Sequence, residues 1–192
     1  TGNVKHTTDS KNFGSSAIYF DGTAAKKLIV PASSDWVLGS GDWSVEFWAN
    51  PTSGTSNQCI WGHGTSSGPH TRHYFIIENS VTAWSFDFFS SGTGDVRFHG
   101  ATNSVDYNTW QHVAFTHSGD TYTLYKNGIM ITALNDASDV LGTSGDLHIG
   151  TNTASSGTED PFKGYIDEFA IYKGVKKYTS VALPGKATIT PS

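Results

Sequence analysis

The sequence is poor in cysteine and in charge. Cys59 is the only cysteine among 192 residues, so no disulfide forms within the chain and redox arguments leave the compartment open. Charged residues make up 15% of the chain, and the net charge is -5. The scattered lysines and arginines form no basic stripe that could follow a phosphate backbone, so we expect no nucleic-acid partner.

Long apolar runs are also missing. A membrane-spanning helix needs about 20 consecutive apolar residues, and no run of this chain approaches that length. The first residues, TGNVKHTTDSKNFG, lack the apolar centre of a signal peptide. We therefore expect no membrane insertion. Because the chain starts at Thr1 without an initiator methionine, we expect a segment of a larger polypeptide, with neighbouring domains as partners.

Turn-forming and aromatic residues are abundant instead. The 21 glycines, with runs of Ser, Thr, Asn and Asp, supply the turns that a chain of short strands needs. Aromatic residues make up 13% of the chain and can fill a core. Short apolar or alternating runs predict strands at 16–20, 27–30, 44–49, 60–62, 74–78, 82–89, 96–100, 111–117, 122–126, 129–133, 146–149 and 165–172.

The segment WSVEFWA shows the two-residue period of a strand. Trp43, Val45 and Phe47 share one face, whereas Glu46 and Trp48 share the other. Because both faces carry aromatic side chains, we expect this strand to lie centrally in a sheet.

The segment TYTLYKNGIMIT predicts a hairpin, because Asn127-Gly128 suits the positive φ angles of a type I′ turn. Strands at this spacing, without amphipathic helices or repeats between them, favour two packed antiparallel sheets. The prediction is an all-β jelly-roll sandwich over residues 1–180. Residues 181–192, where the periodicity is lost, are predicted to be an edge segment or linker.

Three segments in order resemble the laminin G-like group of the concanavalin A-like superfamily. They are FGSSAIYFDGTAAKKLIVPASSDWVLGSGDWSVEFWANP, NTWQHVAFTHSGDTYTLYKNG and GYIDEFAIYKGVKKYTS. The resemblance implies the same sandwich fold. The combination of FDG, GSGDWSVEFW and IDEFAIYKGVKKYTS is most similar to laminin G-like modules in structural proteins of tailed phages. It implies a location on a virion surface, such as a phage tail, or in another extracellular assembly.

The resemblance also implies a structural calcium site. In this superfamily a calcium ion commonly joins the start of the fold to its last strand, which points to Asp167 as a ligand. Asp21 and the turn Ser40-Gly41-Asp42 offer further carboxylate and carbonyl oxygens, which calcium accepts. In the alternative interpretation no ion is bound: Asp21 caps its own turn, and Asp167 accepts backbone N–H bonds at a strand end.

Glycoside hydrolases of the superfamily carry acidic residues that alternate along one strand face, and this sequence has no such strand. Asp167 and Glu168 are adjacent, and a regular strand directs adjacent side chains to opposite faces. They then cannot converge on one glycosidic bond. We expect no enzyme. Four other acids are isolated, each flanked by aromatic, aliphatic or neutral polar residues: Glu46, Glu78, Asp87 and Asp95.

The stretch CIWGHGTSSGPHTRH gathers four residues of types that bind zinc: Cys59, His63, His70 and His73. Their spacing matches no familiar zinc motif. An ordinary buried cysteine with histidines at the rim is the favoured interpretation, and metal binding by this cluster stays open.

The tryptophans divide into two groups. Trp48 and Trp110 lie in segments that look like core strands of the family, so we expect them to pack. Trp61 and Trp84 lie on or beside middle strands, whose exposed face forms a ligand groove in several carbohydrate-active relatives. Sugar rings stack on aromatic planes while polar side chains bond the hydroxyls. The candidate ligand-binding residues are Trp61, Arg72, Trp84, Asp87 and Arg97.

Two considerations weigh against this ligand-binding set. A regular strand turns Trp84 and Asp87 to opposite faces, so they serve one groove only if a bulge redirects one of them. Cross-strand packing within WSFDFF and ordinary surface charge are the alternative explanation.

These observations favour a non-catalytic carbohydrate-binding or adhesion module whose partner is a glycan or cell-surface polysaccharide. One alternative is a structural decoration or oligomerisation domain without glycan binding. The other is a divergent polysaccharide hydrolase. The fold family alone does not decide among them, because related folds host different functions.

Overall fold

The computed structural model describes residues 4–64, 72–90, 94–136, 144–152 and 159–178. These residues form two antiparallel sheets and one short 3-10 helix, η1 (Ser34–Trp36). Sheet A has seven strands in the order β1 (Lys5–Thr7), β2 (Ala17–Asp21), β13 (Lys163–Lys173), β4 (Trp43–Pro51), β9 (Gln111–Ser118), β10 (Thr121–Lys126) and β11 (Ile129–Asn135). Sheet B has six strands in the order β3 (Leu28–Val30), β12 (Leu147–Ile149), β5 (Gln58–Gly64), β6 (Arg72–Glu78), β7 (Ala83–Ser90) and β8 (Gly94–His99).

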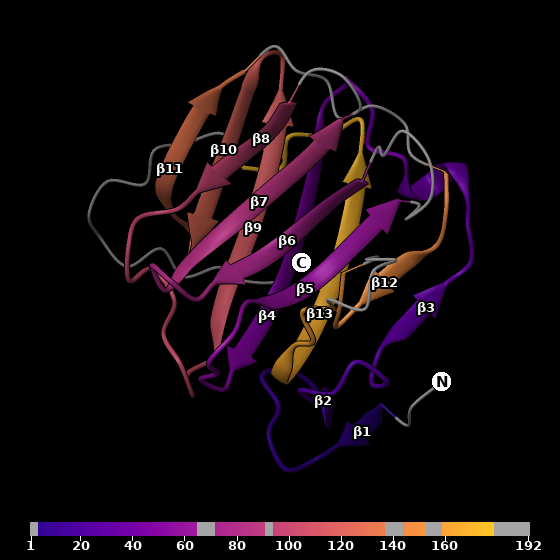
Figure 1. Cartoon of the computed structure of the whole chain (residues 1–192), viewed down its shortest axis with the longest axis vertical. Coiled ribbons are helices and arrows are strands. Elements are labelled where there is room, and N and C mark those ends of the chain that lie inside the picture. Colours follow the sequence, from indigo (N-terminus) through magenta and orange to yellow (C-terminus); the bar gives the residue numbers. More distant parts are fainter. Residues whose placement is uncertain (1–3, 65–71, 91–93, 137–143, 153–158, 179–192) are drawn as a thin grey trace.

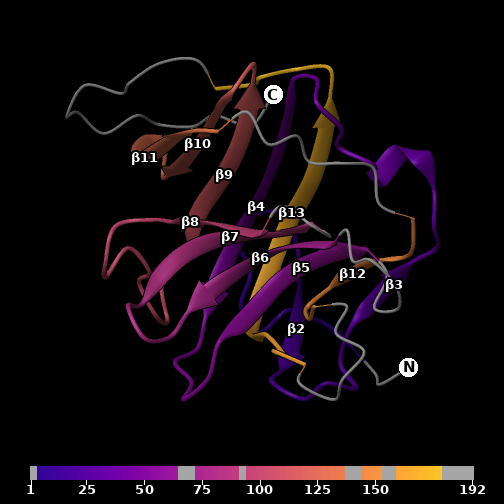
Figure 2. The same ribbon diagram turned by 45° about the horizontal axis from the view of Figure 1, so that its top comes forward.

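The two sheets lie face to face as a sandwich. Figure 1 shows the strands of sheet B crossing over β4, β9 and β13 of sheet A. Figure 2 shows the same two layers from a tilted direction. This is the all-β jelly-roll class that the strand pattern predicts. In the part of the chain that the structure describes, no helix is long and apolar enough to cross a membrane.

Aromatic side chains fill the space between the sheets. Trp43 and Phe47 of β4 point inward, and Phe115 of β9 lies beside them. Phe75 and Phe86 of sheet B pack against this group, with ring centroids 5.9 and 4.5 Å from that of Phe115. The period-two alternation of β4 therefore assigns one of its faces to the core and leaves the other directed away from sheet B.

The structure confirms the predicted strands and the hairpin. Each of the twelve predicted runs overlaps a strand, whereas β1 was not predicted because its three residues carry no alternation. Asn127 and Gly128 have φ angles of 50° and 77°, as a type I′ turn requires. The predicted domain boundary at residue 180 lies outside the described residues.

Two histidines face each other inside the sandwich. His63 of β5 pairs with His73 of β6, and their ring centroids are 5.3 Å apart. Burial, together with the neighbouring His63, lowers the pKa of His73 to about 3. Burial also lowers the pKa of His63. Protonating either ring therefore opposes folding.

This pair predicts loss of stability in mild acid. Between about pH 6.5 and pH 3, His73 is protonated in the unfolded chain but stays neutral in the folded chain. The free energy of unfolding therefore falls as pH falls. His73→Phe keeps a ring against Phe86 and removes this titration. We expect the slope of stability against pH, measured by urea unfolding between pH 6 and 5, to decrease by about 1.4 kcal/mol per pH unit.

The matched control is His6→Gln, which replaces an exposed histidine of β1 outside the buried pair. An unchanged slope in His73→Phe would show that buried His73 is not the acid-sensitive group.

Candidate functional site

The candidate site lies on the outer face of sheet A, the face directed away from sheet B. Ser44, Glu46, Trp48 and Asn50 of β4 alternate with the core residues and therefore share this face. The neighbouring strands β13 and β9 pair with β4 along its length, so their matching residues share the face as well. One part of the face holds a charged cluster, and another part holds a row of aromatic side chains.

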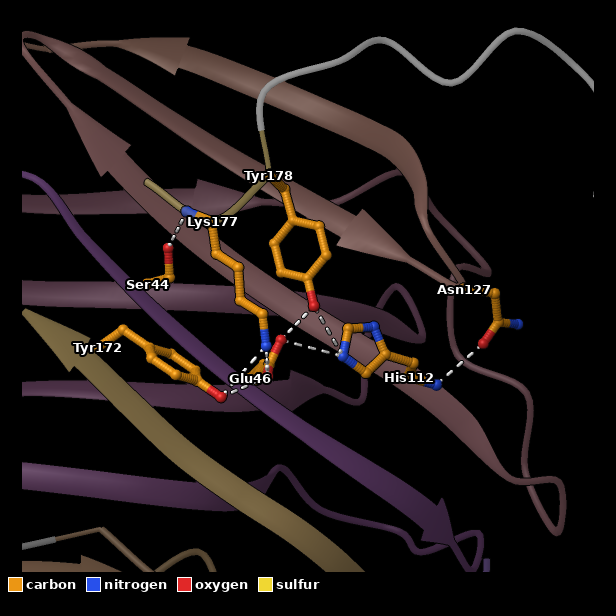
Figure 3. Close-up of polar contacts among 7 residues, drawn as sticks. All are labelled: Ser44, Glu46, His112, Asn127, Tyr172, Lys177 and Tyr178. Carbon is orange, nitrogen blue, oxygen red and sulfur yellow. Dashed lines mark hydrogen bonds and ion pairs between the residues drawn. The ribbon is translucent and has the colours of Figure 1, made fainter. Parts of the chain in front are cut away.

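The charged cluster is built around the Glu46 carboxylate. Figure 3 shows four side chains converging on it, one from β13, one from β9 and two from the segment that follows β13. The Tyr172 hydroxyl donates to Oε1 at 3.0 Å, and His112 Nε2 lies 3.5 Å from Oε2. Lys177 Nζ also donates to Oε1, and the Tyr178 hydroxyl donates to Oε2. Both carboxylate oxygens are therefore fully engaged.

The cluster keeps Glu46 ionised and makes it a poor proton carrier. Burial by itself raises the pKa of the carboxyl group, but the hydrogen bonds from its four partners outweigh burial and lower the pKa to about 2. Burial and the Glu46 carboxylate raise the pKa of Tyr178, so its phenol stays protonated. A general acid or an activated phenolate would need shifts of the opposite sign. The cluster is suited to holding structure.

The structure that it holds is the 174–178 segment, which follows β13 and lies over the outer face. Ser44 Oγ donates to the Val175 carbonyl at 2.9 Å and accepts the Lys177 N–H at 2.9 Å. The Tyr125 hydroxyl donates to the Tyr178 carbonyl at 3.2 Å. These bonds, with the Glu46 cluster, fasten the segment over β4 and β9 and cover this part of the face.

The other part of the outer face carries the aromatic row, which we define as Tyr19, Tyr165, Asn50 and Trp110. Tyr19 of β2 pairs with Tyr165 of β13, and Tyr165 pairs with Asn50 of β4. Trp110 directly precedes β9 and continues the row, since Ala49 pairs with Gln111. The ring centroids of Tyr165 lie 5.1 Å from Tyr19 and 6.3 Å from Trp110. All four side chains are partly exposed.

The tryptophan predictions are largely reversed. Trp48 and Trp110, predicted to be core residues, lie on the outer face and are partly exposed. Trp61 and Trp84, predicted to stack on a ligand, are buried in the core with 1% and 0% exposure. They cannot form a sugar platform in this fold. Alternation puts Trp43 and Trp48 on different faces of β4, but it does not reveal which of the two faces packs against sheet B.

The polar members of the predicted ligand set lie on sheet B. Tyr74 of β6 pairs with Asp87 of β7, and Asp87 pairs with Arg97 of β8. Arg72 belongs to β6 and pairs with Phe89. Asp87 is 2% exposed and lies on the strand face opposite Trp84, because β7 pairs with β6 and β8 without a bulge. Trp61 and Trp84 therefore lie in the core, whereas Asp87 lies on the outer face of sheet B, so the predicted set does not form one surface.

The predicted calcium ligands do not come together. Asp21 pairs with Lys163, four residues before Asp167 on β13, which is about 13 Å along the strand. Asp167 pairs with Trp48 of β4. Asp42 lies six residues before Trp48 in the chain, which is roughly 20 Å along the strand.

The oxygens of this set also have protein partners. Asp21 Oδ1 accepts the Thr23 N–H at 3.0 Å and the Thr23 hydroxyl at 2.7 Å. The carbonyls of Gly41 and Asp42 accept bonds from His117 Nδ1 and the Gly174 N–H, and Ser40 is exposed beside them. Within the described ranges no three His, Cys, Asp or Glu side chains are grouped to hold a metal ion. These residues do not fit one calcium ion, and the ion-free interpretation describes Asp21.

Asp167 and Glu168 depart from regular strand geometry. The pairing of β13 with β4 shifts between Asp167 and Ala170, and Glu168 has a φ of 50°. The bulge interrupts the regular alternation on which the prediction of opposite faces depends, and both residues line one cavity of about 240 Å³. They do not form a free carboxylate pair, because both Asp167 oxygens accept backbone N–H bonds.

Of the four residues considered for zinc binding, Cys59 lies apart from His63 and His73, and these two histidines are buried instead of lying at a rim. Cys59 packs with Tyr74 and Ile76 in a small cluster apart from the main core, whereas His63 and His73 face the interior between the sheets. Burial raises the pKa of the Cys59 thiol, which opposes the thiolate that zinc requires. His70 lies outside the described residues.

Glu46→Gln tests the charged cluster. The substitution removes the charge that two hydroxyls and a lysine satisfy, and we expect the free energy of unfolding at pH 7 to fall by roughly 2–3 kcal/mol. The native carboxyl, with its pKa of about 2, contributes stability above pH 4.5 that is lost as pH falls toward 2. The variant should lose that part of the pH dependence in denaturant titrations.

Glu168→Gln is the matched control, because Glu168 is exposed and contributes no side-chain bond to this cluster. Equal stability of Glu46→Gln and wild type would contradict the assigned role of the cluster.

Chelation tests the calcium prediction. Because the candidate oxygens are separated along the strands and already accept protein donors, we expect EGTA to leave the melting temperature unchanged and added calcium not to raise it. The measurement is a thermal melt of the same preparation in EGTA and in excess calcium. A melting temperature that falls on chelation and recovers with calcium would reveal an ion site.

Comparisons with known proteins agree on the fold. The family model described as the concanavalin A-like lectin/glucanases superfamily, Laminin_G_3, matches residues 21–182. No curated protein sequence matches the chain. Domain 4 of AbnA, an extracellular arabinanase from Geobacillus stearothermophilus solved with arabinotriose, is similar in structure with a TM-score of 0.66 and 21% identity. This match covers 91% of the present chain and 77% of that domain.

Two further structures are similar at lower identity. The CBM40 of the Ruminococcus gnavus IT-sialidase has a TM-score of 0.62 and 14% identity, over 81% of this chain and 89% of that one. The binding domain of botulinum neurotoxin serotype G has a TM-score of 0.65 and 13% identity, over 89% of this chain and 41% of that one. Identities at this level establish a shared sandwich fold. With the family model matching most of its length, the chain belongs to the concanavalin A-like lectin/glucanase superfamily.

Proposed function

We propose that this chain is a non-catalytic carbohydrate-binding module and that the aromatic row is its ligand surface. The observation that carries the proposal is the alignment of two tyrosines, an asparagine and a tryptophan at one level of sheet A, all partly exposed. Aromatic planes bind the apolar faces of sugar rings, and amide and hydroxyl groups bond the sugar hydroxyls. The row offers both kinds of group on a rigid sheet.

The dimensions of the row favour an extended ligand. Tyr19 and Trp110 are three strand spacings apart, about 14 Å at 4.8 Å per spacing. A chain of several sugar units laid across the strands could contact Tyr19, Tyr165 and Trp110 in turn. A single sugar would use only part of the row.

The charge around the row favours a neutral glycan. Its four side chains carry no formal charge, and Lys5, opposite Tyr19, adds one cation at its end. Both arginines of the sequence, Arg72 and Arg97, belong to sheet B strands. Among the similar structures, one was solved with arabinotriose and another with α2,3-sialyllactose. Arginine is the side chain best suited to pair with carboxylates, so the row resembles a surface for the neutral kind of ligand.

We also propose that the module works outside the cell, on a virion or another extracellular assembly. This setting is supported by the resemblance of FDG, GSGDWSVEFW and IDEFAIYKGVKKYTS to laminin G-like modules of tailed-phage structural proteins. In that setting, a module that binds glycans would attach the assembly to a surface that carries them.

Substitution of the aromatic row tests the proposal. We expect the wild-type chain to bind a neutral polysaccharide such as arabinan or laminarin in affinity electrophoresis or calorimetry. Trp110→Ala and Tyr165→Ala should each weaken that binding about tenfold, because each removes a stacking plane worth roughly 1.4 kcal/mol. The melting temperature should change little, since both side chains are partly exposed.

Trp36→Ala is the control, because Trp36 lies in η1, packs against the core and is not a member of the row. Equal binding by wild type, Trp110→Ala and Tyr165→Ala would refute the aromatic row as the ligand surface. Absence of binding to a broad glycan array, together with self-association in solution, would favour the decoration or oligomerisation alternative.

A further inference from the structure

The loop of residues 8–16 crosses the outer face of sheet A. It leaves the sheet at Thr7 and returns at Ala17, which pair with each other at the edge formed by β1 and β2. Ser10 nevertheless contacts Trp110, which precedes β9, and β13 and β4 lie between β2 and β9. The loop therefore extends from the edge of sheet A to the far end of the aromatic row.

Asp167 fastens this loop near its middle. Its Oδ2 atom accepts the backbone N–H groups of Asn12 at 3.3 Å and Phe13 at 3.1 Å. Its Oδ1 atom accepts the N–H of Glu168 at 3.0 Å, within the bulge of β13. Hydrogen bonds to an ionised acceptor are roughly twice as strong as neutral ones. One carboxylate thus joins the last strand to the beginning of the fold.

The fastened loop makes two contacts with the outer-face tryptophans. The Phe13 ring packs edge-on against Trp48, with centroids 5.2 Å apart and planes at 72°. Ser10 Oγ accepts the indole N–H of Trp110 at 3.2 Å. The ring of Trp110 also lies beside Tyr165 in the row. The orientation of the indole therefore depends on where the loop holds Ser10.

We propose that Asp167 is a positioning residue for ligand binding: it holds the 8–16 loop through backbone N–H groups, without a metal ion, and thereby fixes the indole plane of Trp110. This rests on the proposed function of the row. A binding surface that is ordered before the ligand arrives loses less conformational freedom on binding. The family resemblance implies that Asp167 is a calcium ligand, but here its carboxylate accepts hydrogen bonds from protein N–H groups.

Two substitutions separate this role from a calcium role. Asp167→Ala removes the acceptor, so we expect about tenfold weaker binding of arabinan or laminarin, whichever the wild type binds. Asp167→Asn keeps an oxygen that can accept the Asn12 and Phe13 N–H groups, and it should retain affinity within about threefold. A calcium ligand would be weakened in both variants, because the amide lacks the carboxylate charge, and EGTA would reproduce the loss in the wild type. Glu168→Gln, at the exposed neighbouring position, is the control.

A readout without ligand tests the loop itself. In Asp167→Ala we expect faster hydrogen exchange at the Asn12 and Phe13 amides and a displaced indole N–H signal of Trp110 in nitrogen-edited NMR spectra. The Asp167→Asn spectrum should stay close to wild type. Because these signals need no sugar, they remain informative even if no glycan binds and the proposed function fails.

Two outcomes would overturn the inference. Unchanged amide exchange and an unchanged Trp110 signal in Asp167→Ala would show that the carboxylate does not hold the loop. A displaced Trp110 signal with wild-type affinity in Asp167→Ala, while Trp110→Ala loses affinity, would show that the loop is held but does not position the ligand surface.

Discussion

The pairing of β13 with β4 is the constraint on which the outer face of sheet A depends. Its register sets Tyr165 opposite Asn50 and Asp167 opposite Trp48. A slip of β13 by one residue would turn Tyr165 and Asp167 toward sheet B. The alternation of β4 specifies the register strongly, because Trp43, Val45 and Phe47 must meet the core on the other face. The core thus determines the position of the aromatic row.

Two carboxylates fasten chain segments onto this face by different chemistry. Glu46 uses a lysine, two phenols and a histidine to hold the 174–178 segment. Asp167 uses backbone N–H groups to hold the 8–16 loop. The first arrangement depends on side-chain identity, whereas the second depends on backbone geometry and tolerates varied loop side chains. Both satisfy an ionised group within the protein, as a carboxylate withdrawn from water requires.

The sequence could predict the strands, the hairpin and the sandwich, because these follow from local alternation and turn chemistry. It could not predict which face of an alternating strand meets the second sheet. Trp48 and Trp61 were therefore assigned to the wrong environments: the first lies on the outer face and the second in the core.

The sequence could not predict the bulge at Glu168 either, because nothing in GYIDEF indicates a residue with a positive φ angle. The aromatic row combines residues from four separate parts of the chain, and only the sheet order of β2, β13, β4 and β9 brings them to one level. The alternating pattern already contained its members, since Tyr165 precedes Asp167 by two residues and Asn50 follows Trp48 by two. What was missing was the register between the strands.

The satisfied charges also shape what the outer face can recognise. With Glu46 and Asp167 already bonded to protein donors, the groups left beside the row are ring faces, an amide and the phenol groups of Tyr19 and Tyr165. For such a surface we expect binding energy from contact area and short-range hydrogen bonds, because the four side chains of the row carry no formal charge and Lys5 is a single cation at its end. In the proposed binding mode, discrimination among sugars comes from the fit of each ring against a row whose end, Trp110, is held by its hydrogen bond to Ser10 of the 8–16 loop.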